Sequence, residues 1–188
     1  MPNKRYIDET ANWVERVVIK HNFCPFAHKP VRHKLIRYQV CTGSEDEITG
    51  TLIDELILLR DTDQKCIETS ILITPNTLIS FDDYNQYLNV VDVLIKQFNL
   101  QGIIQIAGFH PDYQFADLDI NDVRNYTNRS PYPMFHLILE DSIEKARASY
   151  SNVENIPDNN MSLLLELGLD TAKQQLKDCY SGPDKPTK

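Results

Sequence analysis

Two histidines, two arginines and several aromatic residues lie in one polar stretch of the chain, "FHPDYQFADLDINDVRNYTNRSPYPMFHLILE", residues 109–140. His110 follows an apolar run and precedes a proline, which restricts the backbone and holds the histidine at the end of a strand. A histidine in this position can act as a general base, a substrate donor or a metal ligand. The alternative is a histidine whose ring nitrogens are satisfied by backbone groups in a turn.

The segment "NYTNRSPYP" places Arg129 between amide and hydroxyl side chains and just before two prolines. The prolines lower the conformational entropy that must be lost to hold the arginine in one pose. A fixed guanidinium beside such donors suits a carboxylate or a phosphate. The alternative is a salt bridge that pins the loop to the acidic body of the protein. We predict these residues for binding a small anionic substrate: Gln105, Asn128, Arg129 and Tyr132.

His136 lies within the apolar run "MFHLIL", where alternation would place it on one face of a strand with Met134 and Ile138. A lone histidine on an apolar strand is most often a satisfied core residue. If His110 lies on an adjacent strand, however, the two histidines become candidates for one site.

Cys24 precedes Pro25 in the segment "NFCPFA". Proline favours the first position of a helix, so a short helix starting there would direct backbone N–H groups at the sulfur and lower its pKa. A buried structural thiol is the alternative.

These residues predict an enzyme, in one of two versions. In the first, Cys24, His110 and His136 bind a transition metal, zinc or iron, that keeps an open position for substrate or water. In the second, Cys24 is a nucleophile, a histidine is its base, and Arg129 holds the anion.

Two other hypotheses do not involve catalysis. One is a module that binds a small anion or nucleotide, and the other is an interaction domain that uses aromatic anchors of the loop: Tyr113, Phe115, Tyr126 and Tyr132.

The charge distribution excludes some partners. The net charge is −8, yet residues 1–37 carry +5 and the remainder carries −13. The acidic body argues against nucleic-acid binding, whereas the basic segment could face an anionic ligand or simply be a solvated surface. No apolar run is long enough for a membrane span, and the first residues do not have the pattern of a secretion signal, so the expected location is cytoplasmic.

The hydrophobic pattern predicts alternating strands and helices. Strands are expected at residues 33–40, 69–75, 102–109 and 134–139, and helices at 10–22, 43–61, 81–98, from Asp141 onward, and within 161–179. Residues 152–160 resemble a linker. The predicted N-caps are Asp8 or Thr10, Ser44 and Ser80.

This order predicts one α/β domain over residues 1–180, with a mixed, largely parallel sheet flanked by helices and a disordered tail at 181–188. Ligands of such sheets bind beyond the carboxyl ends of the strands. The site is therefore expected where residues 109–133 leave the sheet.

Several of these motifs occur together in one known family. In order, "CPFA" after a tryptophan-containing helix, "FHPDYQF", "NYTNRSPYP" and "FHLILE" resemble an uncharacterised bacterial family, domain of unknown function 1415. The resemblance covers about residues 8–150. It implies a shared site at these motifs and leaves the reaction open.

Overall fold

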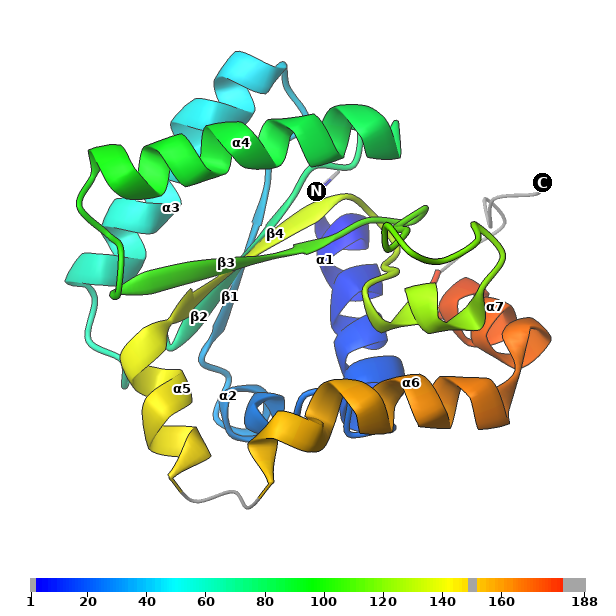
Figure 1. Ribbon diagram of the computed structural model, residues 1–188. Helices are drawn as coiled ribbons and strands as arrows, with labels where there is room; N and C mark the ends of the chain where they lie inside the picture. The colour runs from blue at the N-terminus through cyan, green and yellow to red at the C-terminus, as the bar shows by residue number, and fades with distance from the viewer. Residues whose placement is uncertain (1–2, 149–151, 181–188) are drawn as a thin grey trace.

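The computed structural model describes residues 3–148 and 152–180, and it is built around one four-stranded sheet (Figure 1). The strands lie in the order β1-β2-β4-β3. Helices cover both faces of the sheet, as an α/β fold requires. The predicted disordered tail lies outside the described residues. The strand bounds are β1 (Ile36–Val40), β2 (Thr69–Ile73), β3 (Ile104–Phe109) and β4 (Met134–Leu139).

The sheet is mixed, but the prediction that it is largely parallel was wrong. Only β1 and β2 pair in parallel, whereas β4 pairs antiparallel with both β2 and β3. The cause is the connection between β3 and β4, which contains no crossover helix. The chain returns through residues 110–133 and inserts β4 between two strands that run the opposite way. As a result β3 is an edge strand, and Gln105 within it is exposed rather than buried.

Two long helices, α3 (Glu45–Asp61) and α4 (Phe81–Gln97), cover one face of the sheet (Figure 1). Both predicted caps are confirmed. Ser44 and Glu47 form a capping box, and the Ser80 hydroxyl accepts from the backbone N–H of Asp83. The buried apolar side chains of α3 recur every three or four residues, which is the spacing of one helix face: Ile48, Leu52, Leu56 and Leu59.

One contact between α4 and the sheet explains a glycine. The hydroxyl of Tyr84 donates to the carbonyl of Met134 at 2.8 Å and accepts from the N–H of Phe109 at 3.1 Å, so it joins β3 to β4. A Cβ atom at position 108 would lie 2.8 Å from that hydroxyl. Gly108 is therefore required by the close approach of Tyr84.

The opposite face is covered by the two ends of the chain. At the N-terminus, α1 (Lys4–Trp13) continues into a π-helical turn, η1 (Val14–Ile19), and then into a 3-10 turn, η2 (Pro25–Ala27), and α2 (His28–Arg32). The predicted start of this first helix was wrong, since α1 begins at Lys4 after an Asn3 cap whose side chain makes no capping bond.

The C-terminal helices complete this face. The predicted linker at 152–160 is largely helical, since a 3-10 turn, η4 (Val153–Asn155), leads directly into α6 (Ile156–Leu167). The pattern was missed because a proline and three polar residues, Asp158, Asn159 and Asn160, follow Ile156 in α6, yet Pro157 is compatible with the first turn of a helix. The remaining elements are η3 (Val123–Thr127), α5 (Glu140–Arg147) and α7 (Leu169–Lys177). No helix in the described ranges is long and apolar enough to cross a membrane.

Candidate functional site

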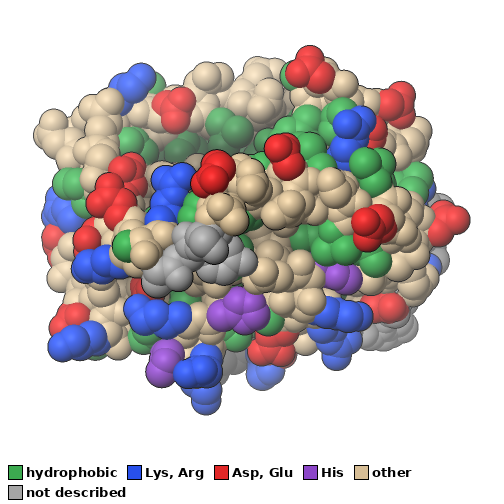
Figure 2. Space-filling view, turned by 60° about the horizontal axis from the view of Figure 1, so that its bottom comes forward, with side chains coloured by type: hydrophobic (Ala, Val, Ile, Leu, Met, Phe, Trp, Pro, Cys, Tyr) green, Lys and Arg blue, Asp and Glu red, His purple; other side chains and the backbone are tan. Residues whose placement is uncertain are grey.

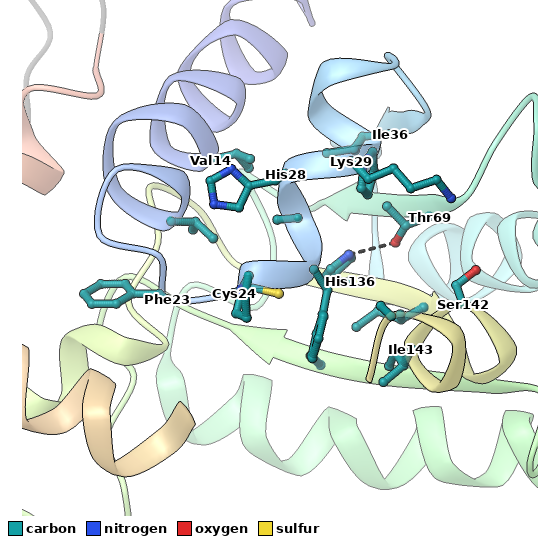
Figure 3. A pocket seen from close by; sticks show the side chains of 18 of the residues that line it. Val14, Phe23, Cys24, His28, Lys29, Ile36, Thr69, His136, Ser142 and Ile143 are labelled. Carbon is teal, nitrogen blue, oxygen red and sulfur yellow. Dashed lines mark hydrogen bonds between the residues drawn. The ribbon is translucent and has the colours of Figure 1, made fainter. Parts of the chain in front are cut away.

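A cavity of about 860 Å³ lies between the sheet and the elements η1, η2, α2, α5 and α6 (Figure 3). Its volume falls in the range of small-molecule sites, roughly 300–1,000 Å³. Side chains of all four strands form its floor, so the cavity opens on a face of the sheet rather than at the strand ends where the sequence placed the site. The floor residues are Ile36, Thr69, Ile71, Gln105, Ala107, Phe109, Met134, His136 and Ile138.

His136 is the main polar group of the floor. Alternation along β4 buries Phe135 and Leu137 against α3 and α4 and turns His136 to the opposite face. Its Nε2 lies 2.7 Å from the hydroxyl of Thr69, which in turn donates to the carbonyl of Leu137 at 2.6 Å (Figure 3). A hydroxyl has one proton to donate, so His136 must donate from Nε2–H.

This tautomer leaves a lone pair on Nδ1 of His136. Burial lowers the pKa of the ring to about 4, because the protonated form loses its hydration in the cavity. His136 is therefore neutral at physiological pH. Its Nδ1 lone pair can accept a hydrogen bond or a proton, but the lowered pKa makes it a weaker base than an ordinary histidine.

Cys24 lies on the wall formed by η2, and its sulfur points along the cavity towards the side of His136 (Figure 3). The predicted short helix is present as η2, with Cys24 in the N-cap position. The backbone N–H groups of Phe26 and Ala27 do lower the thiol pKa, but burial has the larger effect and the net pKa is raised. The predicted low thiol pKa is therefore not found, and Cys24 is protonated at neutral pH.

Basic side chains lie at the mouth of the cavity. Lys29 Nζ pairs with a carboxylate oxygen of Glu68 at 2.8 Å, and Lys145 pairs with Asp141. Arg147 also lines the cavity and is exposed, and it makes no ion pair with any residue in the described ranges. Lys, Arg and His side chains gather along the lower half of the face of the molecule shown in Figure 2.

Four of the seven residues that the sequence singled out line this cavity: Cys24, Gln105, Asn128 and His136. Asn128 is held in place because its side-chain amide donates to the carbonyl of Gly108 at 3.1 Å. The structure thus brings together one histidine and the cysteine from the predicted site, with two amides beside them.

His110 does not belong to this group. Its ring lies on the α4 side of the sheet, beside Phe81 and Tyr84, and is fully buried. Nε2 donates to the carbonyl of Leu78 at 3.0 Å, and Nδ1 accepts from the N–H of Asp112 at 3.0 Å. Both nitrogens are satisfied by backbone, which is the turn alternative, and burial lowers the ring pKa.

The prediction that Cys24, His110 and His136 together bind a metal ion was wrong. Cys24 and His136 face the cavity, whereas His110 lies across the sheet from them. Within the described ranges, no group of three or more His, Cys, Asp or Glu side chains could hold a metal ion.

Arg129 and Tyr132 also lie outside the cavity. Arg129 donates to the carbonyls of Tyr113 at 3.2 Å and Ile120 at 2.8 Å, and its guanidinium lies over the ring of Tyr126. It pins the loop as the alternative expected, but through carbonyls rather than a salt bridge. The hydroxyl of Tyr132 donates to the buried carboxylate of Glu9.

Sequence reasoning missed Thr69 and the residues of α2 and α5 that line the cavity. Thr69 lies in an apolar strand and gives no local signal of contact with His136. Lys29 follows the "CPFA" motif in the basic N-terminal segment, and the charge asymmetry of that segment was the available signal. Arg147 had no such signal, because its position depends on how α5 packs beside the sheet.

Comparison with known families agrees with the motifs. A family model described as "Protein of unknown function (DUF1415)" matches residues 5–174. The chain belongs to the DUF1415 family. The match spans every element that lines the cavity, from α1 to α6. No curated protein matches the chain. No solved structure matches it either.

Proposed function

We propose that this DUF1415 protein is a cytoplasmic enzyme that uses Cys24 as nucleophile and His136 as base on a small anionic metabolite. The observation that carries the proposal is one cavity that holds both the thiol and a neutral imidazole with an available lone pair. A protonated thiol needs such a base, because the thiolate is the reactive form.

The reaction we propose is acyl transfer. The Cys24 sulfur attacks a carbonyl carbon while Nδ1 of His136 takes the thiol proton. The leaving group departs with that proton, and water then hydrolyses the thioester to release the acid and regenerate the thiol. Thr69 acts as a positioning residue, since it fixes the tautomer that leaves Nδ1 free.

The test is hydrolysis of p-nitrophenyl butyrate, with intact-mass detection of a butyryl adduct on Cys24. Replacing Cys24 with serine should abolish the adduct, and His136→Ala should slow its formation by about 10²–10⁴-fold. Cys66→Ser is the matched control, because Cys66 is an exposed free thiol outside the cavity. Equal rates in the Cys24→Ser and Cys66→Ser proteins would overturn the proposal.

A second function is favoured by the raised pKa of Cys24. A buried thiol with a raised pKa is protonated and unreactive, and such a thiol also suits a protein that binds a ligand without catalysing a reaction. In that case the cavity binds a small anion, no adduct forms in the wild type, and Cys24→Ser leaves ligand affinity unchanged.

A further inference from the structure

We infer that the ligand of this cavity is an amphipathic carboxylate, with an elongated apolar body on the face of the sheet and its carboxylate on Arg147. The inference rests on the cavity of the proposed function and deepens it by naming the ligand class. It assigns to Arg147 the role that the sequence had given to Arg129.

The apolar body follows from what lines the cavity. The sheet contributes Ile71, Met134 and Ile138, while the opposite walls contribute Phe26 and Ile143 together with other apolar side chains. A highly polar metabolite would lose its hydration against such walls without finding partners. An acyl or aryl chain gains free energy there in proportion to the apolar area it covers.

The carboxylate follows from the charges at the mouth. Three basic residues and one acidic residue line the cavity, in a protein whose net charge is −8. Lys29 and Lys145 already have carboxylate partners, whereas Arg147 has no ion pair within the described residues. A guanidinium binds a carboxylate through two parallel hydrogen bonds, so Arg147 is the group best suited to anchor it.

The experiment uses the fluorescence of Trp13, which is the single tryptophan of the chain and lies at the cavity. Decanoate, hexanoate, acetate and decanamide are titrated into the full-length protein. We expect decanoate to bind most tightly, with shorter chains weaker and the uncharged amide at least about tenfold weaker than decanoate.

Arg147→Met should weaken decanoate binding by about tenfold or more and leave decanamide unchanged, since the substitution removes the charge and keeps an apolar stem. Arg60→Met is the matched control, because Arg60 is an exposed arginine on α3, on the other face of the sheet. Ile143→Phe fills part of the cavity and should weaken decanoate and decanamide together, whereas Val93→Phe, at an exposed position of α4, should change neither.

Decanoate that fails to bind, or that binds equally to the wild type and the Arg147→Met protein, would overturn the inference. The decanoate titration and the butyryl-adduct assay together distinguish a failure of this inference from a failure of the proposed function. If decanoate binds through Arg147 but no butyryl adduct forms, the chemistry is wrong and the ligand class stands. If the butyryl adduct forms but decanoate binds no more tightly than decanamide, the ligand class is wrong and the chemistry stands.

Discussion

The two histidines show how environment decides the role of a side chain. His110 directly follows β3 and His136 lies within β4 of the same sheet, and burial lowers the pKa of both rings. The ring of His110 has a backbone partner at each nitrogen. Among the described residues, the ring of His136 has one hydrogen-bond partner, Thr69, and its other nitrogen keeps a lone pair beside a cavity. Only the second arrangement leaves a group that can act on a ligand.

The lowered pKa of His136 makes stability depend on pH. The folded value is about 4 and the reference value is 6.5, so between these pH values the unfolded chain binds the proton more readily. Stability that is present above pH 6.5 is therefore lost as the pH falls towards 4, by about 1–3 kcal/mol from this group alone.

Urea denaturation at pH 7 and pH 4.5 measures the effect. His136→Gln should lose less stability between the two pH values than the wild type does, because the variant has no proton to take up at this position. His33→Gln, at an exposed histidine, is the control and should behave like the wild type. An identical loss in the wild type and His136→Gln would show that His136 does not titrate as described.

At the scale of elements, local signals predicted most of the helices and strands. The capping box at Ser44 and the apolar run at Thr69–Ile73 are complete in the sequence itself, and both predictions are confirmed. The antiparallel placement of β4 could not be predicted in this way. It depends on the path that residues 110–133 take between β3 and β4, and no local pattern encodes that path.

The loop between β3 and β4 is held by polar side chains within it, and one of them, Arg129, was predicted to bind a substrate instead. Buried Asn125 accepts from the N–H of Phe115 and donates to the carbonyl of Asp119, and Arg129 donates to two further carbonyls. A polar, proline-rich stretch suits a ligand site and a self-bonded loop equally well. The choice depends on which carbonyls the folded loop presents, and that is set by tertiary structure.

A structural role for Arg129 has a measurable consequence. Arg129→Met leaves the carbonyls of Tyr113 and Ile120 without their donor, so we expect a loss of about 2–4 kcal/mol in the free energy of unfolding. Decanoate affinity should change less than about twofold, because Arg129 does not line the large cavity.

Arg124→Met is the matched control on the same loop. Arg124 is partly exposed and pairs with Asp122, so its loss should lower the free energy of unfolding much less than the loss of Arg129 does. If Arg129→Met instead kept its stability and lost ligand binding, the side chain would belong to the site after all.

At the scale of the whole molecule, the site is assembled from distant parts of the chain. Cys24 comes from the N-terminal segment, His136 from β4, which is one of the two inner strands of the sheet, and Asn160 from α6. The sequence could identify the cysteine and the histidine as candidates by their neighbours. It could not show that His110 and His136 face opposite sides of the sheet, since that depends on strand register and on the path of the loop.

One hydrogen bond couples the two ends of the chain at the cavity. The side-chain amide of Asn160, which is buried, donates to the carbonyl of Phe23 at 2.8 Å, and both residues line the cavity beside Cys24. Asn160→Ala should lower the free energy of unfolding by about 1–3 kcal/mol, because it leaves a buried carbonyl without its donor. It should also weaken decanoate binding, since the wall that carries Phe23 and Cys24 loses its support from α6.

Urea denaturation and the Trp13 titration measure the two effects on the same protein samples. Asn89→Ala is the control, because the amide of Asn89 makes a comparable bond to a backbone carbonyl on the exposed side of α4. If Asn160→Ala lost stability while its decanoate affinity equalled that of Asn89→Ala, the N-terminal wall would hold its position without α6. The cavity would then be shaped by the N-terminal segment and the sheet alone.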